Sequence, residues 1–356
     1  MMRGNIKDKL IDNNIVIVFL SVAIVGFFIS DMNATFVVNE VITRFVRNGI
    51  MVLALIIPII SGLGLNFAIS IGALCANFGF VIVIMKGIGG YPGLLVALLI
   101  GVVLSVFTGY LIGVILNKVK GNEMIATIII GFLGTSIYQL VFMVGYGTVF
   151  KVDNKEILLS KGIGIRHVID MVDYRNTINE LLTLSIGGIR IPIFMIALTI
   201  AFALVVKYIL NTPLGIKFKA VGEDFEKSKL SGINSEKVRI KAIIISTVMA
   251  CVGQIIYLQD IGMLSVYTAH MNRDVFACAA ILVGGATLRK ASIKNAFVGL
   301  ILFHFLFVVT PQAGQNLFSS VAIGEYFRTF IAYGIIAFSI MYNSGDKKHF
   351  NSINMK

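Results

Sequence analysis

The stretch GLLVALLIGVVLSVFTGYLIGVIL, residues 93–116, carries no charged side chain and decides the class of fold. A helix needs roughly 20 apolar residues to cross about 30 Å of hydrocarbon, and this run is long enough. Because lipid cannot hydrogen-bond to the peptide backbone, only a helix or a closed barrel satisfies the backbone there. We therefore expect a transmembrane helix.

The rest of the chain has the same character. Of its 356 residues, 57% are hydrophobic and 13% are charged, against roughly 25% charged residues in an ordinary soluble domain. The mean hydropathy of +0.92 leaves too few polar residues to coat soluble domains of this total length. The net charge of +12 is therefore attributed to cytoplasmic loops that anchor membrane helices, and we expect no nucleic-acid partner.

Apolar runs bounded by Lys/Arg, Asn, Gly or Pro predict an all-α, polytopic membrane protein with about ten transmembrane helices, which we treat as one domain over 1–356. The runs are 15–29, 48–61, 66–85, 93–116, 123–146, 190–210, 240–258, 274–288, 293–310 and 325–342. Two of them, 48–61 and 274–288, are short, so we expect tilted, broken or re-entrant helices there. Pro58 lies inside the first of these two and predicts a kink.

The distribution of lysine and arginine predicts that both chain termini are cytoplasmic, an N-in/C-in topology. Five predicted spans then lie on each side of a long extracytoplasmic loop, 147–189. An odd number of spans per half makes the two halves enter the membrane from opposite sides, which favours a 5+5 inverted repeat. Residues 60–74 and 281–300 both place paired glycines beside a polar interruption, a faint echo between the halves.

The sequence shows no motif for covalent chemistry. Its four histidines are too far apart for HxxxH or HExxH spacing, and its three cysteines, Cys75, Cys251 and Cys278, form no CxxC pair. We therefore expect no metal site, no cofactor and no catalytic residue. The chain also lacks a GxxxxGK[ST] phosphate loop, so any energy from ATP must come through a separate protein.

The longest predicted cytoplasmic loop, 211–239, contains the segment GEDFEKSKLSG at 222–232. Its acidic residues come first and its lysines later, an order that stabilises the two ends of a short helix, and a glycine follows that accepts a left-handed cap. We predict a helix over 223–231, with Glu223 and Lys227 paired at i, i+4. Three apolar residues nearby, Phe225, Leu230 and Ile233, suit docking on a partner, and a helix lying on the membrane surface is the alternative.

Four stretches carry a family resemblance. Residues 220–262, beginning AVGEDFEKSKLSGIN, resemble a segment of the permease subunits of ABC importers for branched-chain amino acids, ribose and nucleosides, and ILVGGATL at 281–288 is similar to a second motif of these permeases. GNEMIATIIIGF at 121–132 is closer to the nucleoside-type permeases. GLGLNFAISIGA at 62–73 looks like a motif of the sugar-type permeases, and this sequence departs from that motif at Asn66 and Phe67.

The resemblance implies the membrane subunit of an importer in the plasma (inner) membrane, working with a second permease subunit as a homodimer or heterodimer. Two ATP-binding subunits and an extracytoplasmic solute-binding protein would complete it. A simple sugar is the first expectation for the solute, a nucleoside or branched-chain amino acid the alternatives, and a self-sufficient secondary carrier the alternative class. The residues implied to couple the permease to the ATP-binding subunit are Gly222, Glu223, Asp224, Leu230, Ser231, Gly232 and Ile233.

Polar side chains inside the predicted spans are few, and each must face protein or a wet cavity. The candidates for a translocation path are Asn66, Ser70, Gln139 and Gln254. Hydrogen bonding between helices is their alternative role. Glu123 is expected to be a solvated acid at a helix start. The charged loop 147–189 is expected to form a structured platform for the solute-binding protein, with a solvated lid as the alternative.

Overall fold

The structure is a computed structural model that describes residues 6–150, 157–159, 162–175 and 177–353. Within them, six helices are long and apolar enough to cross a membrane. They are Ala34–Ile60, Gly90–Lys118, Glu123–Gly145, Ile193–Asn211, Ser235–Ile261 and Ile293–Phe318. Val16–Ser30 and Ile69–Met85 form shorter apolar helices. The chain is thus a multi-pass helical membrane protein, and the prediction of about ten spans exceeds the number found by length and composition.

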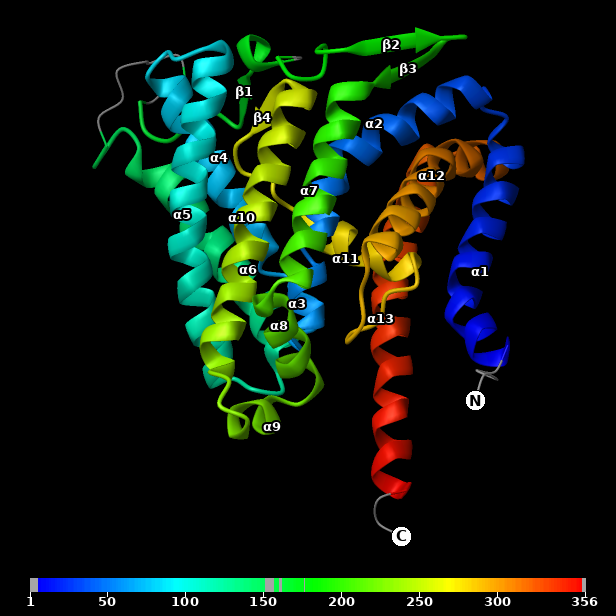
Figure 1. Cartoon of the computed structure of the whole chain (residues 1–356). Coiled ribbons are helices and arrows are strands. Elements are labelled where there is room, and N and C mark those ends of the chain that lie inside the picture. The colour runs from blue at the N-terminus through cyan, green and yellow to red at the C-terminus, as the bar shows by residue number, and fades with distance from the viewer. Residues whose placement is uncertain (1–5, 151–156, 160–161, 176, 354–356) are drawn as a thin grey trace.

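Helices make up most of the chain (Figure 1). The first half contains α1 (Ile6–Ser30), α2 (Ala34–Leu53), α3 (Ile56–Ile60), α4 (Ile69–Met85), α5 (Gly90–Lys118), α6 (Glu123–Leu140) and the π-helical turn η1 (Val141–Gly145). The second half contains α7 (Ile193–Asn211), α8 (Pro213–Glu223), α9 (Phe225–Leu230), α10 (Ser235–Ile261), α11 (Arg273–Val283), α12 (Ile293–Phe318) and α13 (Val321–Ile353).

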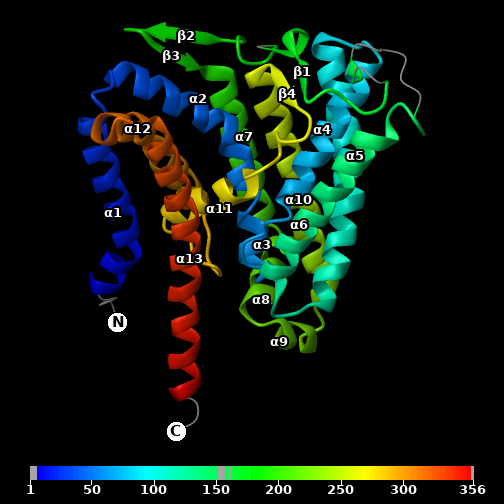
Figure 2. The same cartoon turned by 180° about the vertical axis from the view of Figure 1, so that it is seen from behind.

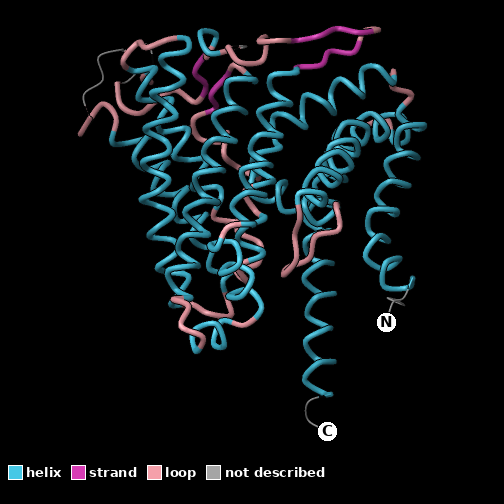
Figure 3. The backbone as a smooth tube through the Cα atoms, in the orientation of Figure 1, coloured by secondary structure: helices cyan, strands magenta, loops and turns pink. Residues whose placement is uncertain are grey.

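In the part of the chain that the structure describes, four short strands add to the all-α fold that the sequence predicts. The strands β1 (Val168–Asp170) and β4 (Met263–Ser265) pair antiparallel, as do β2 (Thr183–Ile186) and β3 (Ile189–Pro192). The loop between β2 and β3 consists of two glycines with positive φ, the geometry of a tight hairpin. All four strands gather at one end of the molecule, opposite α9 (Figure 3). Three of them belong to the 147–189 loop or follow it directly, so part of this loop is structured.

The predicted span 48–61 is the end of a longer helix that starts at Ala34. The first half of that helix was missed because charged residues interrupt its apolar run. These residues find partners in the fold: Arg44 pairs with Glu40 one turn earlier, and Arg47 pairs with Asp260 on α10. The helix breaks between α2 and α3, just before Pro58, which confirms the predicted kink.

The core lies where α10 packs against α4 and α5, seen side by side in Figures 1 and 2. Glycines allow these helices to approach closely. A Cβ at Gly113 of α5 would lie 2.8 Å from Ile240 Cα of α10, and a Cβ at Gly72 of α4 would lie 2.4 Å from the Thr247 carbonyl oxygen. Close helix packing through small residues is typical of membrane bundles.

The ends of the chain share a side with α9. In Figure 1, α1 begins and α13 ends toward the end of the molecule that carries α9, away from the strands. This arrangement agrees with the N-in/C-in topology if α9 is cytoplasmic and the strands are extracytoplasmic. The short helix α11, in the region of the short predicted span 274–288, lies about midway between the two ends (Figure 2).

Candidate functional site

The longest predicted cytoplasmic loop, 211–239, folds as two short helices, and polar side chains cap them. The Thr212 hydroxyl accepts a hydrogen bond from the Gly215 amide at 3.4 Å, and Pro213 stands at the first position of α8. The Asp224 carboxylate accepts from the Lys227 amide at 2.9 Å and starts α9. The loop is therefore an ordered element rather than a flexible connection.

The helix predicted over 223–231 is shorter than expected. Glu223 is the last residue of α8, and Asp224 has the extended backbone of a cap, with φ −154° and ψ 109°. Consequently Lys227 pairs with Asp224, with 3.3 Å between Nζ and Oδ2, in place of the predicted pair with Glu223. The hydrogen bond from the Lys227 amide, helped by its ammonium group, lowers the pKa of Asp224. Gly232, just beyond α9, has φ +82°, the left-handed backbone predicted for it.

Only one of the three apolar residues assigned to docking points into open space. Leu230 is 88% exposed, the largest exposure of any large hydrophobic residue that the structure describes. Phe225 and Ile233 instead pack against the protein core. The Phe225 ring lies under Lys120, with Nζ 3.9 Å from its centroid, and the Ser235 hydroxyl donates to the Phe225 carbonyl at 3.2 Å.

Around Leu230 the surface is polar and hollowed. Exposed neighbours on this tip are Glu223, Glu226, Lys227, Lys229, Ser231 and Gly232. A hollow of about 300 Å³ lies where the loop turns into α10, lined by Lys229, Gly232, Ile233, Asn234, Ser235 and Glu236. A protruding leucine beside a polar hollow is a surface to which a protein of complementary shape can bind.

A buried ion pair supports the base of the loop. Arg239 on α10 and Glu123 at the start of α6 lie 2.5 Å apart, and their side chains are only 5% and 14% exposed. Glu123 is therefore paired and largely enclosed, not solvated as expected. The Arg239 guanidinium also lies 5.5 Å from the Phe225 ring. No local pattern could indicate this pair, because its members are 116 positions apart.

Gly222 joins the loop 211–239 to the membrane helices. A Cβ at Gly222 would lie 1.9 Å from the Ile60 carbonyl oxygen and 3.0 Å from the Gly62 amide nitrogen. Gly62 itself has φ +76°, and a Cβ on it would lie 2.9 Å from Gly222 Cα. The end of α8 therefore touches the break between α3 and α4 backbone to backbone, and any side chain at Gly222 would force the two segments apart.

The four candidate path residues are each hydrogen-bonded inside the protein. Asn66 donates to the Ser246 hydroxyl of α10 at 3.2 Å and accepts from the Ala68 amide at 3.1 Å. Ser70 donates to the Phe67 carbonyl at 3.0 Å. Asn66 lies just before α4 and Ser70 lies in its first turn, only a few residues after the point in the break that Gly222 touches.

Gln139 and Gln254 lie nearer the strand end, in other surroundings. Gln139 donates to the Tyr267 carbonyl at 3.5 Å. Gln254 is fully buried on α10, donates to Asn77 of α4 at 3.2 Å and accepts from Arg273 at 3.1 Å. Gln254 is therefore hydrogen-bonded to Asn77 and Arg273, and the sequence did not predict either contact. A single basic residue beside a short predicted span was the available signal for Arg273.

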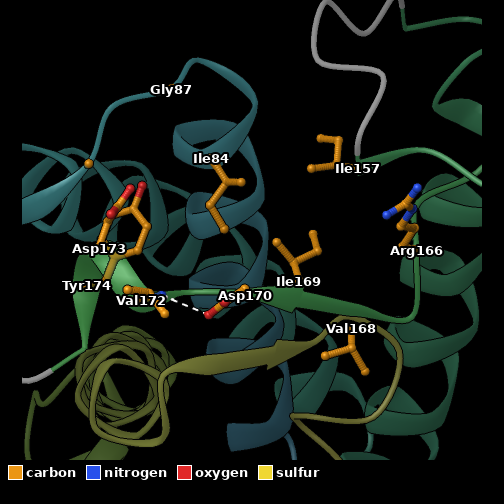
Figure 4. A pocket seen from close by; sticks show the side chains of 11 residues that line it. Ile84, Gly87, Ile157, Arg166, Val168, Ile169, Asp170, Val172, Asp173 and Tyr174 are labelled. Carbon is orange, nitrogen blue, oxygen red and sulfur yellow. Dashed lines mark hydrogen bonds between the residues drawn. The ribbon is translucent and has the colours of Figure 1, made fainter.

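Two hollows open at the strand end. The larger, about 460 Å³, lies between the end of α4 and β1 (Figure 4). Its lining includes Arg166 on one side and Asp173 on the other. Burial raises the pKa of Tyr174, at its edge, to about 12. The second hollow, about 380 Å³, is lined by Glu40, Thr43, Val46, Arg47, Arg175, Asn179, Glu180, Thr183, Arg190, Pro192 and Asp260.

Across the described ranges, no group of three or more His, Cys, Asp or Glu residues could hold a metal ion. The three cysteines are buried as free thiols and act as small core residues. What the fold offers instead is a helical membrane bundle with a capped, protruding loop at one end and polar hollows at the other, the features of a transport permease.

Comparison with known proteins identifies the family. The family described as "Branched-chain amino acid transport system / permease component" matches residues 37–339. Because the match covers most of the chain, the protein belongs to this family. The ribose import permease of Haemophilus influenzae is 26% identical over 301 residues, which is 81% of this chain and 83% of that protein. No solved structure gives a significant match.

Two further relatives match over shorter stretches. The nucleoside ABC transporter permease of Lactococcus lactis is 23% identical over 227 residues, 62% of this chain and 56% of that protein. The xylose transport system permease of Haemophilus influenzae is 24% identical over 163 residues, 45% of this chain and 40% of that protein. The relatives are thus permease subunits named for simple sugars and for nucleosides.

Proposed function

We propose that the chain is the membrane-spanning permease subunit of an ABC importer in the plasma (inner) membrane, and that it passes a simple sugar. The family match and the ribose and xylose relatives support this function. The nucleoside relative makes a nucleoside the second candidate, and the family description makes branched-chain amino acids the third. The chain itself carries out no reaction, since ATP hydrolysis belongs to a partner.

The observation that carries the proposal is the exposed tip of α9. Burying a leucine side chain is worth about 1.5–3 kcal/mol, so a leucine left 88% exposed on a capped helix is a site at which binding can gain free energy. Its polar surroundings and the neighbouring hollow suit a water-soluble partner. We assign this surface, Glu223, Asp224 and Leu230 to Ile233, to an ATP-binding subunit.

The remaining partners follow from the rest of the fold. A second permease copy, identical or similar, would give each of two ATP-binding subunits one coupling loop. The solute-binding protein would dock on the strand end, where the two charged hollows lie. Asn66, Ser70, Gln139 and Gln254 are proposed as polar contacts that open to the solute when the helices move.

In this mechanism Gly222 transmits the motion of α8 to the break between α3 and α4. Although the resemblance groups it with the residues that touch the ATP-binding subunit, its position favours an inward role against Ile60 and Gly62. When the ATP-binding subunits close, α8 would push directly on the break between α3 and α4. That break leads within a few residues to Asn66, so the motion would reach a candidate path residue through backbone contact alone.

The test is co-purification with the ATP-binding subunits of the same transporter. Leu230→Ser should leave the melting temperature of the permease unchanged and abolish co-purification, because the side chain contributes little to the fold. Leu184→Ser is the matched control, since this leucine is 51% exposed on β2 at the opposite end. If Leu230→Ser and Leu184→Ser both retained the ATP-binding subunits as well as the wild-type chain does, the docking surface would be refuted.

A further inference from the structure

Lys120 joins α9 to the membrane helices at a second place. It lies in the loop 119–122 between α5 and α6, at the end of the molecule that carries α9 (Figure 1). Its Nζ lies 3.9 Å from the centroid of the Phe225 ring and 3.9 Å from Oε1 of Glu226, both on α9. An exposed ion pair contributes little alone, but a cation that also lies over an aromatic ring is held by both contacts. The loop before α6 is therefore attached to α9.

A largely enclosed ion pair fixes the start of α6 close to this attachment. Glu123, the first residue of α6, pairs with Arg239 of α10. Separating such a pair leaves an uncompensated charge in a low-dielectric environment, so the contact resists being broken. Lys120 lies only a few residues before this fixed point. A displacement of Lys120 would therefore turn α6 about the Glu123–Arg239 pair rather than carry the whole helix away.

Within this chain, α6 is packed lightly enough to turn. Only 17% of its apolar stretch is buried, against 61% of the apolar stretch of α10. Its first turns nevertheless touch the segment between α3 and α4. The Thr127 hydroxyl accepts a hydrogen bond from the Phe67 amide at 3.3 Å, and a Cβ on Gly64 would lie 3.3 Å from Met124 Cγ. Turning α6 would thus displace this segment.

The segment between α3 and α4 is thus contacted from two elements. Gly222 of α8 touches it directly, whereas α6 touches it at Gly64 and Phe67. Asn66, a candidate path residue, lies between these two contacts of α6 in the chain. Because α8 and α9 belong to one loop, a movement of that loop would reach Asn66 by a direct route through Gly222 and by an indirect route through Lys120 and α6.

We propose that Lys120 is a positioning residue that carries the motion of α9 into α6. The inference rests on the proposed function, in which ATP-binding subunits dock on the tip of α9. When these subunits close, α9 would draw the loop 119–122 with it, α6 would turn about Glu123, and the segment that holds Asn66 would follow. The ammonium group of Lys120 makes both contacts with α9, so truncation to alanine removes them together.

Hydrogen exchange in the complete complex, with and without a non-hydrolysable ATP analogue, tests this route without a solute. In the wild type the analogue should change the exchange rates of the amides of residues 126–130 in α6 by at least about fivefold, the lower end of typical coupling between sites. Lys120→Ala should lose this change, while its melting temperature and its co-purification with the ATP-binding subunits match the wild type. Lys120→Arg should keep the change, because a guanidinium forms the same ring contact and ion pair.

Lys118→Ala is the matched control, since Lys118 is exposed in the last turn of α5 and, in the described part of the chain, forms no ion pair or ring contact. It should keep the full change. An equal change in Lys120→Ala and the wild type, or no change in the wild-type complex, would overturn the route through α6. A permease that binds no ATP-binding subunit would instead overturn the proposed function on which this route rests.

Discussion

Replacing Gly222 by alanine tests whether the coupling loop acts through backbone contact. The new Cβ would start 1.9 Å from the Ile60 carbonyl oxygen, whereas real Cβ atoms keep at least 3.0 Å from such neighbours. The end of α8 must therefore move away from α3 by about 1.1 Å. Forcing a methyl group into a packed contact costs about 1–3 kcal/mol. If that cost destabilises the contact of α8 with Ile60, the coupling between the ATP-binding subunits and the membrane helices weakens by about 5–150-fold.

The assay is ATP-driven solute uptake into proteoliposomes that contain the complete transporter. Gly222→Ala should reduce uptake at least about fivefold while the ATP-binding subunits still co-purify, because Leu230 and the rest of the tip are unchanged. Gly334→Ala in α13 is the matched control, since a Cβ there meets nothing within 4 Å. Wild-type uptake by Gly222→Ala, at equal protein levels and equal melting temperature, would refute the reasoning.

Two further predictions concern the base and the cap of the loop. Arg239→Ala leaves Glu123 buried without its partner and should lower the free energy of unfolding by about 3–5 kcal/mol. Chemical denaturation of the purified variant measures this loss, and a denaturation curve that matches the wild type would contradict the prediction. The lowered pKa of Asp224 means that its carboxylate stabilises α9 above its unfolded pKa, and that this stabilisation is lost as the pH falls through the lowered value. As the pH falls through the lowered pKa of Asp224, hydrogen-exchange protection of the Lys227 amide should decrease in the wild type. It should persist in Asp224→Asn, because the amide oxygen of asparagine accepts the same hydrogen bond at every pH. Equal pH profiles of the two proteins would show that Asp224 does not cause the loss of protection.

Local patterns in the sequence predicted the features that depend on local physics. Uninterrupted apolar runs gave α5 and α7 nearly to their ends, because hydrocarbon length sets the length of a helix. Pro58 marked a helix break because it lacks an amide hydrogen. The acidic start and glycine end of 222–232 indicated a short helix with a left-handed turn at Gly232, and both are present.

The features that the sequence did not reveal depend on distant partners. The charged part of α2 looked too polar for a span, but Arg47 meets Asp260 from 213 positions away. Phe225 looked free to dock, but Lys120 covers its ring. Similarly, the inward role of Gly222 is visible only once α8 is seated on Ile60. In each case the deciding contact joins segments that no local pattern connects.

The most direct measurement of the central claim is solute uptake by purified, reconstituted protein under two conditions. The complete complex, with ATP-binding subunits and solute-binding protein, should take up a simple sugar only when ATP is supplied. The chain alone, under a proton or sodium gradient, should take up none. Gradient-driven uptake by the chain alone, at the rate of the complete complex, would contradict the account and identify a secondary carrier.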